Sequence, residues 1–475
     1  MDITRDPIPG LIRRIAVPAS LGFFFNTMFN VVDTFYAGRL STDSLAALSL
    51  SFPIFFIMMS IAIGIQSGGS ALIANSLGEG NRRRAVVYQV QAITLAVIST
   101  IVVAVPLFFA LPGIFRFFGA EGAVFAGGLR YMRVIVGGSI LIIVANTINA
   151  GLQARGDTRS WRNLLIAMSI ANIVLDPVLM FGLELGGTVV VPRLEEAGTA
   201  LATVMLFGVG GLYLLREARR AGAFSGATLR DFRPDRQRMR ELIGQALPAA
   251  MNFMIMTLGS FVINYYVSRF GRDPIAAYGT ALRIEQIALL PLLGINVALA
   301  TLVAQNNGAG RLDRVQEAFS KALRYALVVT VAVLTPVIAL APVLLRLFTD
   351  TAAVVQIGRT YLYIQVLTFF SYILINMCNS VLQGLKQPGM IVWIAVYRQV
   401  AAPFAVFPLL AFTLGMEETG VFWGLVIVNW TAAVFSFYWA GSVLRNRITA
   451  AGSSAEVPRF GAVSLPSFRD APPGE

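Results

Sequence analysis

The chain has 475 residues, of which 56% are hydrophobic and only 13% are charged, and its formal net charge is +12. Soluble domains carry about 25% charged residues, so this composition excludes a protein with a fully water-facing surface. The sequence has no histidine and one cysteine, Cys378. Histidine proton relays, histidine metal sites and an intrachain disulfide are therefore excluded.

Apolar segments long enough to cross a bilayer recur along the chain. A membrane-spanning helix needs roughly 20 predominantly apolar residues. The first segment is too long for the apolar part of a cleavable signal peptide, and no small-residue cleavage site follows it. We predict an all-α integral membrane protein with twelve transmembrane helices, over residues 11–38, 46–75, 87–112, 124–152, 162–184, 197–216, 241–269, 277–307, 319–346, 355–385, 390–414 and 420–445.

The second half of the chain repeats the first. One constant offset aligns matching residues throughout, such as Pro18 with Pro248, Gly78 with Gly308, Asn146 with Asn376 and Gln153 with Gln383. Many transporters are built from such duplicated bundles and place a binding site between them. We therefore predict two pseudo-symmetric six-helix lobes. The N-lobe covers 1–220, a cytoplasmic interlobe loop 221–240, the C-lobe 241–446 and a disordered cytoplasmic tail 447–475.

Arginines concentrate in the loops on one side of the predicted helices, above all in the interlobe stretch Arg216–Arg240. The positive-inside rule then places both termini in the cytoplasm. The basic excess is explained by topology and by attraction to anionic lipid, which excludes nucleic acid as a partner. Residues 231–241 are either an amphipathic helix on the inner leaflet or part of a solvated linker.

Two carboxylates lie inside predicted membrane helices, Asp33 in the first and Asp176 in the fifth. A carboxylate at bilayer depth costs about 2.5–3.5 kcal/mol on insertion scales and by default marks an ion or proton path. The alternative is an acid at a helix end or in a structural ion pair, but neither acid has a cationic neighbour in its own span. Asn172 lies one turn before Asp176 on the same face. Converging carboxylates would share one proton, or would bind Na⁺ together with Asn172.

Amides accompany these acids at helical spacing. Asn26 and Asn30 step toward Asp33 along one stripe of the first helix, and Asn146 and Asn149 form a similar stripe on the fourth. Such amides donate to a carboxylate or offer a carbonyl oxygen to a cation, and the alternative for each is packing between helices. The fourth-helix pair recurs in the second half, so we expect it to be structural as well as functional.

The acid pair itself is not duplicated. The positions that repeat Asp33 and Asp176 are Ile263 and Val406. The second half instead has one buried acid, Glu285, two residues from Arg283. We interpret Glu285 as a residue of the substrate cavity or of an ion pair.

Three segments resemble a known family, and the resemblance extends over about residues 10–445. They read FPIFFIMMSIAIGIQSGGSALIANSLGEGN, NTINAGLQARGDTR (with its repeat NMCNSVLQGLKQPG) and RIEQIALLPLLGINVALATLVAQNNGAG. The chain resembles the multidrug and toxic compound extrusion (MATE) transporters, and its N-lobe acids resemble those of the prokaryotic DinF-like branch. The family's second-lobe acids have no counterpart in the seventh and tenth spans, which leaves the N-lobe as the expected coupling site.

The resemblance implies a V-shaped bundle of two six-helix lobes and specific roles for particular residues. The cation or proton coupling set would be Asp33, Asp176, Asn172, Asn146 and Thr203. Aromatic and methionine side chains suit an adaptable cavity. The expected substrate cavity is lined by Asn26, Phe29, Asn30, Tyr36, Asn149, Met168, Met205, Met256 and Glu285.

The resemblance also implies a secondary active antiporter, which exports amphipathic, often cationic organic compounds in exchange for H⁺, with Na⁺ as the alternative coupling ion. We expect a monomer in the bacterial inner membrane, with no cofactor and no metal other than Na⁺ at Asp33, Asn172 and Asp176. A flippase for lipid-linked saccharides would need a strongly cationic central cavity. A membrane-embedded enzyme would need a nucleophile, base or metal cluster, and without histidine the sequence supplies none.

Overall fold

The computed structural model describes residues 1–450. Within them, twelve helices are long and apolar enough to cross a membrane, as the sequence predicts. The helices of the first half are α1 (Ile8–Leu40), α2 (Thr42–Gly78), α3 (Arg82–Phe117), α4 (Gly122–Ala154), α5 (Arg159–Phe181) and α6 (Glu196–Arg220).

The second half repeats this order with one irregular span. Its regular helices are α7 (Arg236–Ser268), α8 (Arg272–Gly308), α9 (Leu312–Ala339), the short α10 (Ala341–Arg346), α11 (Ala352–Gly384) and α14 (Glu417–Ala450). The eleventh span is broken by two π-helical turns. It consists of α12 (Gly389–Val396), the turn η2 (Tyr397–Ala401), α13 (Ala402–Pro408) and the turn η3 (Leu409–Thr413).

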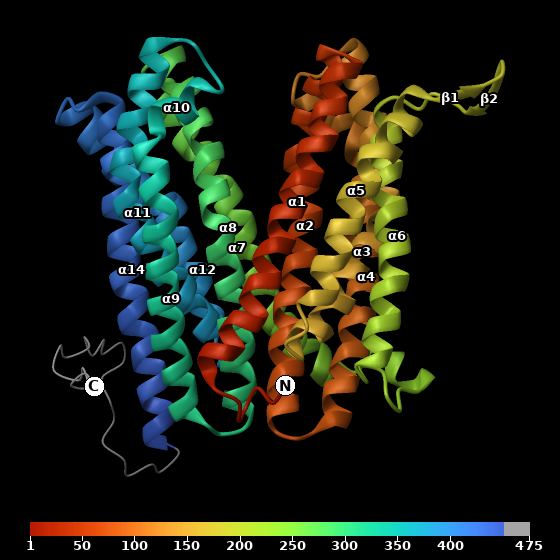
Figure 1. Cartoon of the computed structure of the whole chain (residues 1–475), viewed down its shortest axis with the longest axis vertical. Coiled ribbons are helices and arrows are strands. Elements are labelled where there is room, and N and C mark those ends of the chain that lie inside the picture. Colours follow the sequence, from red (N-terminus) through yellow and green to blue (C-terminus); the bar gives the residue numbers. More distant parts are fainter. Residues whose placement is uncertain (451–475) are drawn as a thin grey trace, which may run out of the picture.

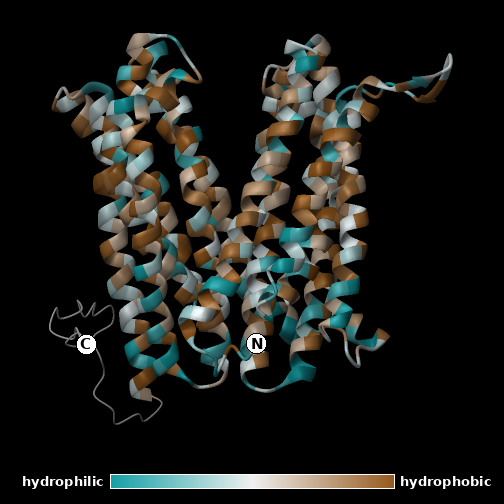
Figure 2. Ribbon diagram, in the orientation of Figure 1, coloured by the Kyte–Doolittle hydropathy of each residue, from teal (hydrophilic) through white to brown (hydrophobic). Residues whose placement is uncertain are grey.

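The two halves form two bundles that meet at one end and diverge toward the other, as Figure 1 shows. The N-terminus and the end of α14 lie at the end where the bundles meet. Hydrophobic residues dominate the middle of the helices, and hydrophilic residues gather around the end where the N-terminus lies (Figure 2). We call the end with the N-terminus the terminal end and the other the divergent end. The predicted fold of twelve helices in a V-shaped bundle is confirmed.

The lobes meet through α2, which packs against α7 and α8. Glycines permit this close approach, because a Cβ at Gly78 would collide with the backbone carbonyl of Gln305 and one at Gly308 with that of Asn75. Small residues let membrane helices approach backbone to backbone. The Nδ2 of Asn307 donates to Oδ1 of Asn75 at 2.6 Å across the same contact. The duplicated glycines thus close the terminal end of the molecule.

The first helix belongs to both lobes, which the sequence did not predict. Its beginning is buried in the apolar core of the C-lobe, and Ser20 Oγ donates to the carbonyl oxygen of Pro291 in α8. Its second half packs on α5, where Ser169 Oγ donates to the carbonyl oxygen of Phe25 at 2.7 Å. Thr158, which precedes α5, also donates to the carbonyl oxygen of Ile15 at 2.8 Å, so the first half of α1 contacts both lobes. The predicted division falls between α6 and α7, and α1 contacts helices on both sides of it.

The interlobe segment is not a separate amphipathic helix. A single 3-10 turn, η1 (Leu229–Phe232), precedes α7, which already begins at Arg236. Arg83 of α3 forms a 2.6 Å ion pair with Asp231. The backbone N–H of Thr228 donates to Asp231 and lowers its pKa most, and the Arg83 guanidinium lowers it further, to about 2. The linker is thereby fixed to the end of α3.

Two further features depart from the predicted boundaries. A two-stranded antiparallel hairpin, β1 (Leu183–Leu185) and β2 (Thr188–Val191), follows α5, where the sequence predicts helix up to residue 184. It projects from the divergent end in Figure 1. The last helix continues to Ala450, beyond the predicted end of the C-lobe. The predicted disorder of the tail otherwise falls on 451–475, outside the described residues.

Candidate coupling site and its cavity

The two predicted acids come from neighbouring helices, α1 and α5. Asp33 is 8% exposed, and Asp176 and Asn172 are fully buried. The Nδ2 of Asn172 donates to Oδ1 of Asp33 at 3.1 Å. The one-turn spacing of Asn172 and Asp176 puts both on the face of α5 that packs on α1. The helical pattern thus brings these three side chains together.

Asp176 has an unusual environment for a carboxyl group. Neither of its oxygens has a hydrogen-bond partner among the described residues. The carboxyl groups of Asp33 and Asp176 are close enough to interact directly, and no cationic side chain pairs with either in the described part of the chain. A buried charge without a partner is strongly unfavourable. This pair is therefore suited to hold a proton or a cation.

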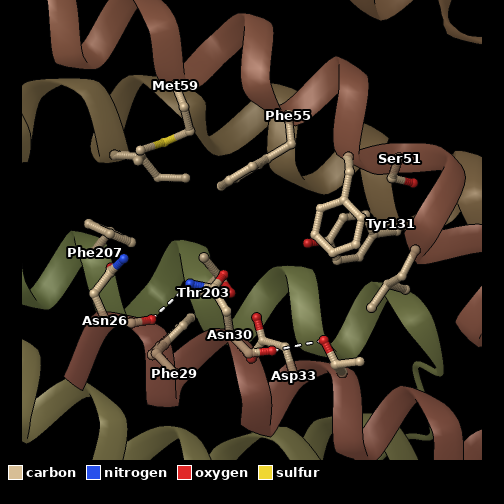
Figure 3. Close-up of a pocket in the computed structure, with 14 residues that line it drawn as sticks. Asn26, Phe29, Asn30, Asp33, Ser51, Phe55, Met59, Tyr131, Thr203 and Phe207 are labelled. Carbon is tan, nitrogen blue, oxygen red and sulfur yellow. Dashed lines mark hydrogen bonds between the residues drawn. The ribbon is translucent and has the colours of Figure 1, made fainter. Parts of the chain in front are cut away.

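A cavity of about 80 Å³ opens beside Asp33 (Figure 3). Asn26, Phe29 and Asn30 of α1 line it on one side, and the labelled residues of α2 face them across the space in the figure. Thr203 of α6 also lines it, and its hydroxyl oxygen has no partner within residues 1–450. The remaining lining residues are Thr34, Leu48, Ser51, Phe52, Phe55, Met59, Tyr131, Ile142 and Phe207.

The amide stripe of α1 is engaged with its own helix. Asn30 Nδ2 donates to the backbone carbonyl oxygen of Asn26 at 2.8 Å. The hydroxyl of Thr34 donates to the backbone carbonyl oxygen of Asn30 at 2.9 Å. These groups border the cavity without bonding to either acid. Among the residues described, no three of His, Cys, Asp or Glu cluster closely enough to hold a metal ion. A bound Na⁺ would thus depend on amide and hydroxyl oxygens beside the two carboxylates.

Several predicted site residues lie elsewhere. Asn146 donates back to the carbonyl oxygen of Ile142 in its own helix, and Asn149 is buried without lining the cavity. Tyr36 joins α1 to α5 by donating to the carbonyl oxygen of Ile173 at 3.0 Å. Met168 packs in an apolar cluster with Phe29, whereas Met205 is 45% exposed. Met256 and Glu285 line a different cavity, in the C-lobe.

Two residues near these cavities were missed by the sequence analysis. Tyr131 of α4 lines the N-lobe cavity and lies close enough to both acids to interact electrostatically. In the sequence it lies between Arg130 and Arg133, and no residue pattern around it indicates a binding or coupling site. Arg398 lines the C-lobe cavity and is 8% exposed. An arginine in the middle of an apolar span was a signal that could have found it.

Comparison with known families matches both halves separately. The MatE family model matches residues 18–178 and again 248–407. The two matches coincide with the two copies of the internal repeat, and together they cover more than half of the chain.

Individual relatives are 22–29% identical to this chain and match it over most of their own length. A protein of Shewanella oneidensis named FAD transporter is 29% identical over 74% of this chain and 76% of its own. The probable multidrug resistance protein NorM of Thermotoga maritima is 24% identical over 85% and 86%. The multidrug export protein MepA of Staphylococcus aureus is 22% identical over 94% and 96%.

Solved structures share the whole fold. An outward-facing multidrug resistance MATE transporter of the MOP superfamily superposes with a TM-score of 0.85 at 24% identity, covering 95% of this chain and 98% of that one. A MATE structure in a bent conformation gives a TM-score of 0.87 at 23% identity with the same coverage. Together with the family match, these likenesses identify the chain as a membrane transporter of the MATE family, and not an enzyme.

Proposed function

We propose that this MATE transporter is a secondary active antiporter that exports amphipathic organic compounds and is driven by H⁺ entering at Asp33 and Asp176. The observation that carries the proposal is the buried carboxyl group of Asp176, which has no hydrogen-bond partner within the described residues and lies beside Asp33. A proton neutralises one of these groups, and two adjacent carboxylates that are both charged repel each other.

The proton would act through the contact between α1 and α5. Asn172 donates to Asp33 at 3.1 Å, and a carboxylate accepts such a bond more strongly than a neutral acid does. Protonation of Asp33 therefore weakens the attachment of α1 to α5 and favours a different packing of the helix. Because Asp33 lines the cavity, this repacking changes the space in which a substrate lies and couples proton entry to substrate release.

The coupling ion is tested by separating the two gradients. Purified protein is reconstituted in vesicles, and transport of a fluorescent organic cation is followed with a proton gradient alone and with a Na⁺ gradient alone. We expect transport with the proton gradient only. Transport that requires Na⁺ and ignores the proton gradient would instead assign Asp33, Asn172 and Asp176 as a Na⁺ site.

The substrate has a second candidate class. The relative from Shewanella oneidensis is named FAD transporter, and its 29% identity exceeds that of the multidrug exporters reported above. A flavin dinucleotide is an anionic aromatic compound, so it differs in charge from the organic cations that we propose first. Vesicles assayed with flavin adenine dinucleotide and with an organic cation under the same proton gradient distinguish the two classes.

We further propose that the protein is a monomer in a bacterial inner membrane, with the terminal end in the cytoplasm. The arginine-rich segment around residues 216–240 lies at the terminal end, where a positive-inside bias would place it. The lobes then diverge toward the outside.

Labelling tests this orientation at Ser225, which is exposed in the interlobe segment. We expect that Ser225→Cys on a Cys378→Ser background is not labelled by a membrane-impermeant maleimide in intact cells, but is labelled after permeabilisation. A cysteine introduced into the hairpin at Thr188 is the positive control and should label from outside. Strong labelling at residue 225 in intact cells would reverse the orientation.

The lobes should not be interchangeable in coupling. Ile263 repeats Asp33, and Ala402 repeats Asn172, so the C-lobe position lacks the amide that donates to Asp33. A new carboxyl group there would remain neutral or destabilise the lobe. We expect that Ile263→Asp fails to restore proton-driven efflux to an Asp33→Asn protein. Restored efflux would show that either lobe can couple.

A further inference from the structure

The C-lobe has a cavity of about 210 Å³ whose lining repeats part of the N-lobe cavity. Asn26, Asp33 and Phe55 line the first, and their repeat partners Met256, Ile263 and Glu285 line the second. The duplication has thus produced two spaces at related positions in the two lobes. The acid of the first cavity has become apolar in the second, and an acid appears where the first has a phenylalanine.

Glu285 is 3% exposed and its carboxylate accepts a hydrogen bond from the hydroxyl of Tyr361 at 2.7 Å. Within residues 1–450 Glu285 makes no other hydrogen bond. A carboxylate has lone pairs for about four hydrogen bonds. Glu285 therefore retains acceptor capacity toward the cavity that it lines.

Arg398 lines the same cavity from the π-helical turn η2 and is 8% exposed. Its Nε has no partner in the described part of the chain, and its Nη1 reaches Oδ1 of Asn429 only at 3.5 Å. The guanidinium carbon lies 5.6 Å from the ring centre of Tyr372. π-Helical turns inside α-helices are frequent at functional sites, and this one carries a buried cation with free donors.

The two opposite charges do not pair with each other. No ion pair joins Glu285 to Arg398 within residues 1–450, and each lies beside aromatic side chains. Buried charges are normally paired, because an unpaired one is strongly unfavourable. A guanidinium with free donors and a carboxyl group with free acceptor capacity, both lining one cavity, match a ligand that carries a carboxylate and a hydrogen-bond-donating cationic end.

We propose that the C-lobe cavity is a second ligand site and that it binds zwitterionic aromatic compounds. The carboxylate of the ligand contacts Arg398, whose planar fork suits a bidentate carboxylate contact. The cationic end of the ligand faces Glu285. This site is separate from the N-lobe acids and requires no ion gradient, so it does not depend on the proposed coupling mechanism.

The walls of the cavity suit an aromatic ligand body. Tyr278 and Tyr372 line it together with Leu282, Leu289 and Met256. Its volume of about 210 Å³ lies below the roughly 300–1,000 Å³ of typical ligand pockets, so it would hold a small aromatic body or part of a larger one; like those pockets, it has mostly apolar walls and a few polar groups. Gln399, Asn376 and Asn429 supply the polar groups besides the two charges.

The test uses two dyes that differ only at the proposed contact. Rhodamine 110 carries a cationic xanthene and a carboxylate, and rhodamine 123 is its methyl ester. Binding of each dye to the full chain in lipid nanodiscs is measured by fluorescence polarisation without a gradient. We expect Arg398→Gln to weaken rhodamine 110 binding about 10- to 100-fold, as is typical when a charged hydrogen-bond partner is lost. Rhodamine 123 binding should change less than about 3-fold, because its ester carries no charge to lose.

Matched variants separate this contact from general damage. Arg346→Gln removes the same charge from an exposed position of the C-lobe and should leave rhodamine 110 binding unchanged. Arg398→Lys keeps the charge without the planar fork and should bind rhodamine 110 with intermediate affinity. Unchanged rhodamine 123 binding shows that the Arg398→Gln protein is folded. Equal losses for both dyes, or no loss for either, would overturn the proposal.

Discussion

Asp33→Asn is expected to abolish proton-driven efflux, down to the rate of vesicles without the protein. The change removes the titrating group but keeps a side chain of similar size and polarity that Asn172 can still contact. The helix packing that buries this position is largely unaffected, so the protein should still insert and unfold at a similar temperature. Efflux of an organic cation under an imposed proton gradient measures the first effect, and thermal unfolding in detergent measures the second.

Asp176→Asn should be as severe, and the double variant little worse than either single one, because residues that act as one unit are non-additive. Asp350→Asn is the matched control, since it removes an exposed carboxylate from the C-lobe and should leave efflux unchanged. Full proton-driven efflux by the Asp33→Asn protein would show that this acid is structural and that coupling lies elsewhere.

Gly78→Ala should have the second large effect. The added Cβ would meet the backbone carbonyl of Gln305, and a backbone atom cannot rotate away as the end of a side chain can. Overpacking of this kind costs about 1–3 kcal/mol or more. The loss falls on the contact that closes the terminal end, so we expect a lower unfolding temperature. Where closure of this end limits transport, the efflux rate should fall by roughly 5- to 150-fold, since about 1.4 kcal/mol corresponds to a factor of ten.

Gly244→Ala tests whether this result is specific to the lobe contact. Gly244 lies in α7, and a Cβ there would meet nothing within 4 Å. Alanine is the better helix former by roughly 1 kcal/mol, so this variant should be as stable as the parent or more stable, with normal efflux. If Gly78→Ala behaved like Gly244→Ala, the close approach at Gln305 would not limit closure.

Sequence reasoning was strongest where a period repeats over many residues. Apolar length alone predicted the twelve spans, and one constant offset predicted the two lobes. The one-turn spacing of Asn172 and Asp176 placed both on the face that meets α1. Each of these inferences depends on helix geometry, which is the same in every protein.

The rest depended on contacts between distant segments, which no local pattern encodes. The position of Tyr131 beside the two acids is fixed by how α4 packs, not by the residues around it in the chain. The polar stripe of Asn146 and Asn149 predicted a buried helix face, and both residues are buried. The stripe could not indicate which neighbouring helix that face contacts.

The passage of α1 between the lobes has a mechanical consequence. Its lower part is held in the C-lobe core through Ser20, and its upper part is held on α5 through Phe25. The helix is thus held by both lobes, so a movement of one lobe relative to the other would load it. Asp33 lies eight residues beyond Phe25, about 12 Å along the axis. A change in how tightly Asp33 is held would therefore alter the packing of a helix that the opposite lobe also holds.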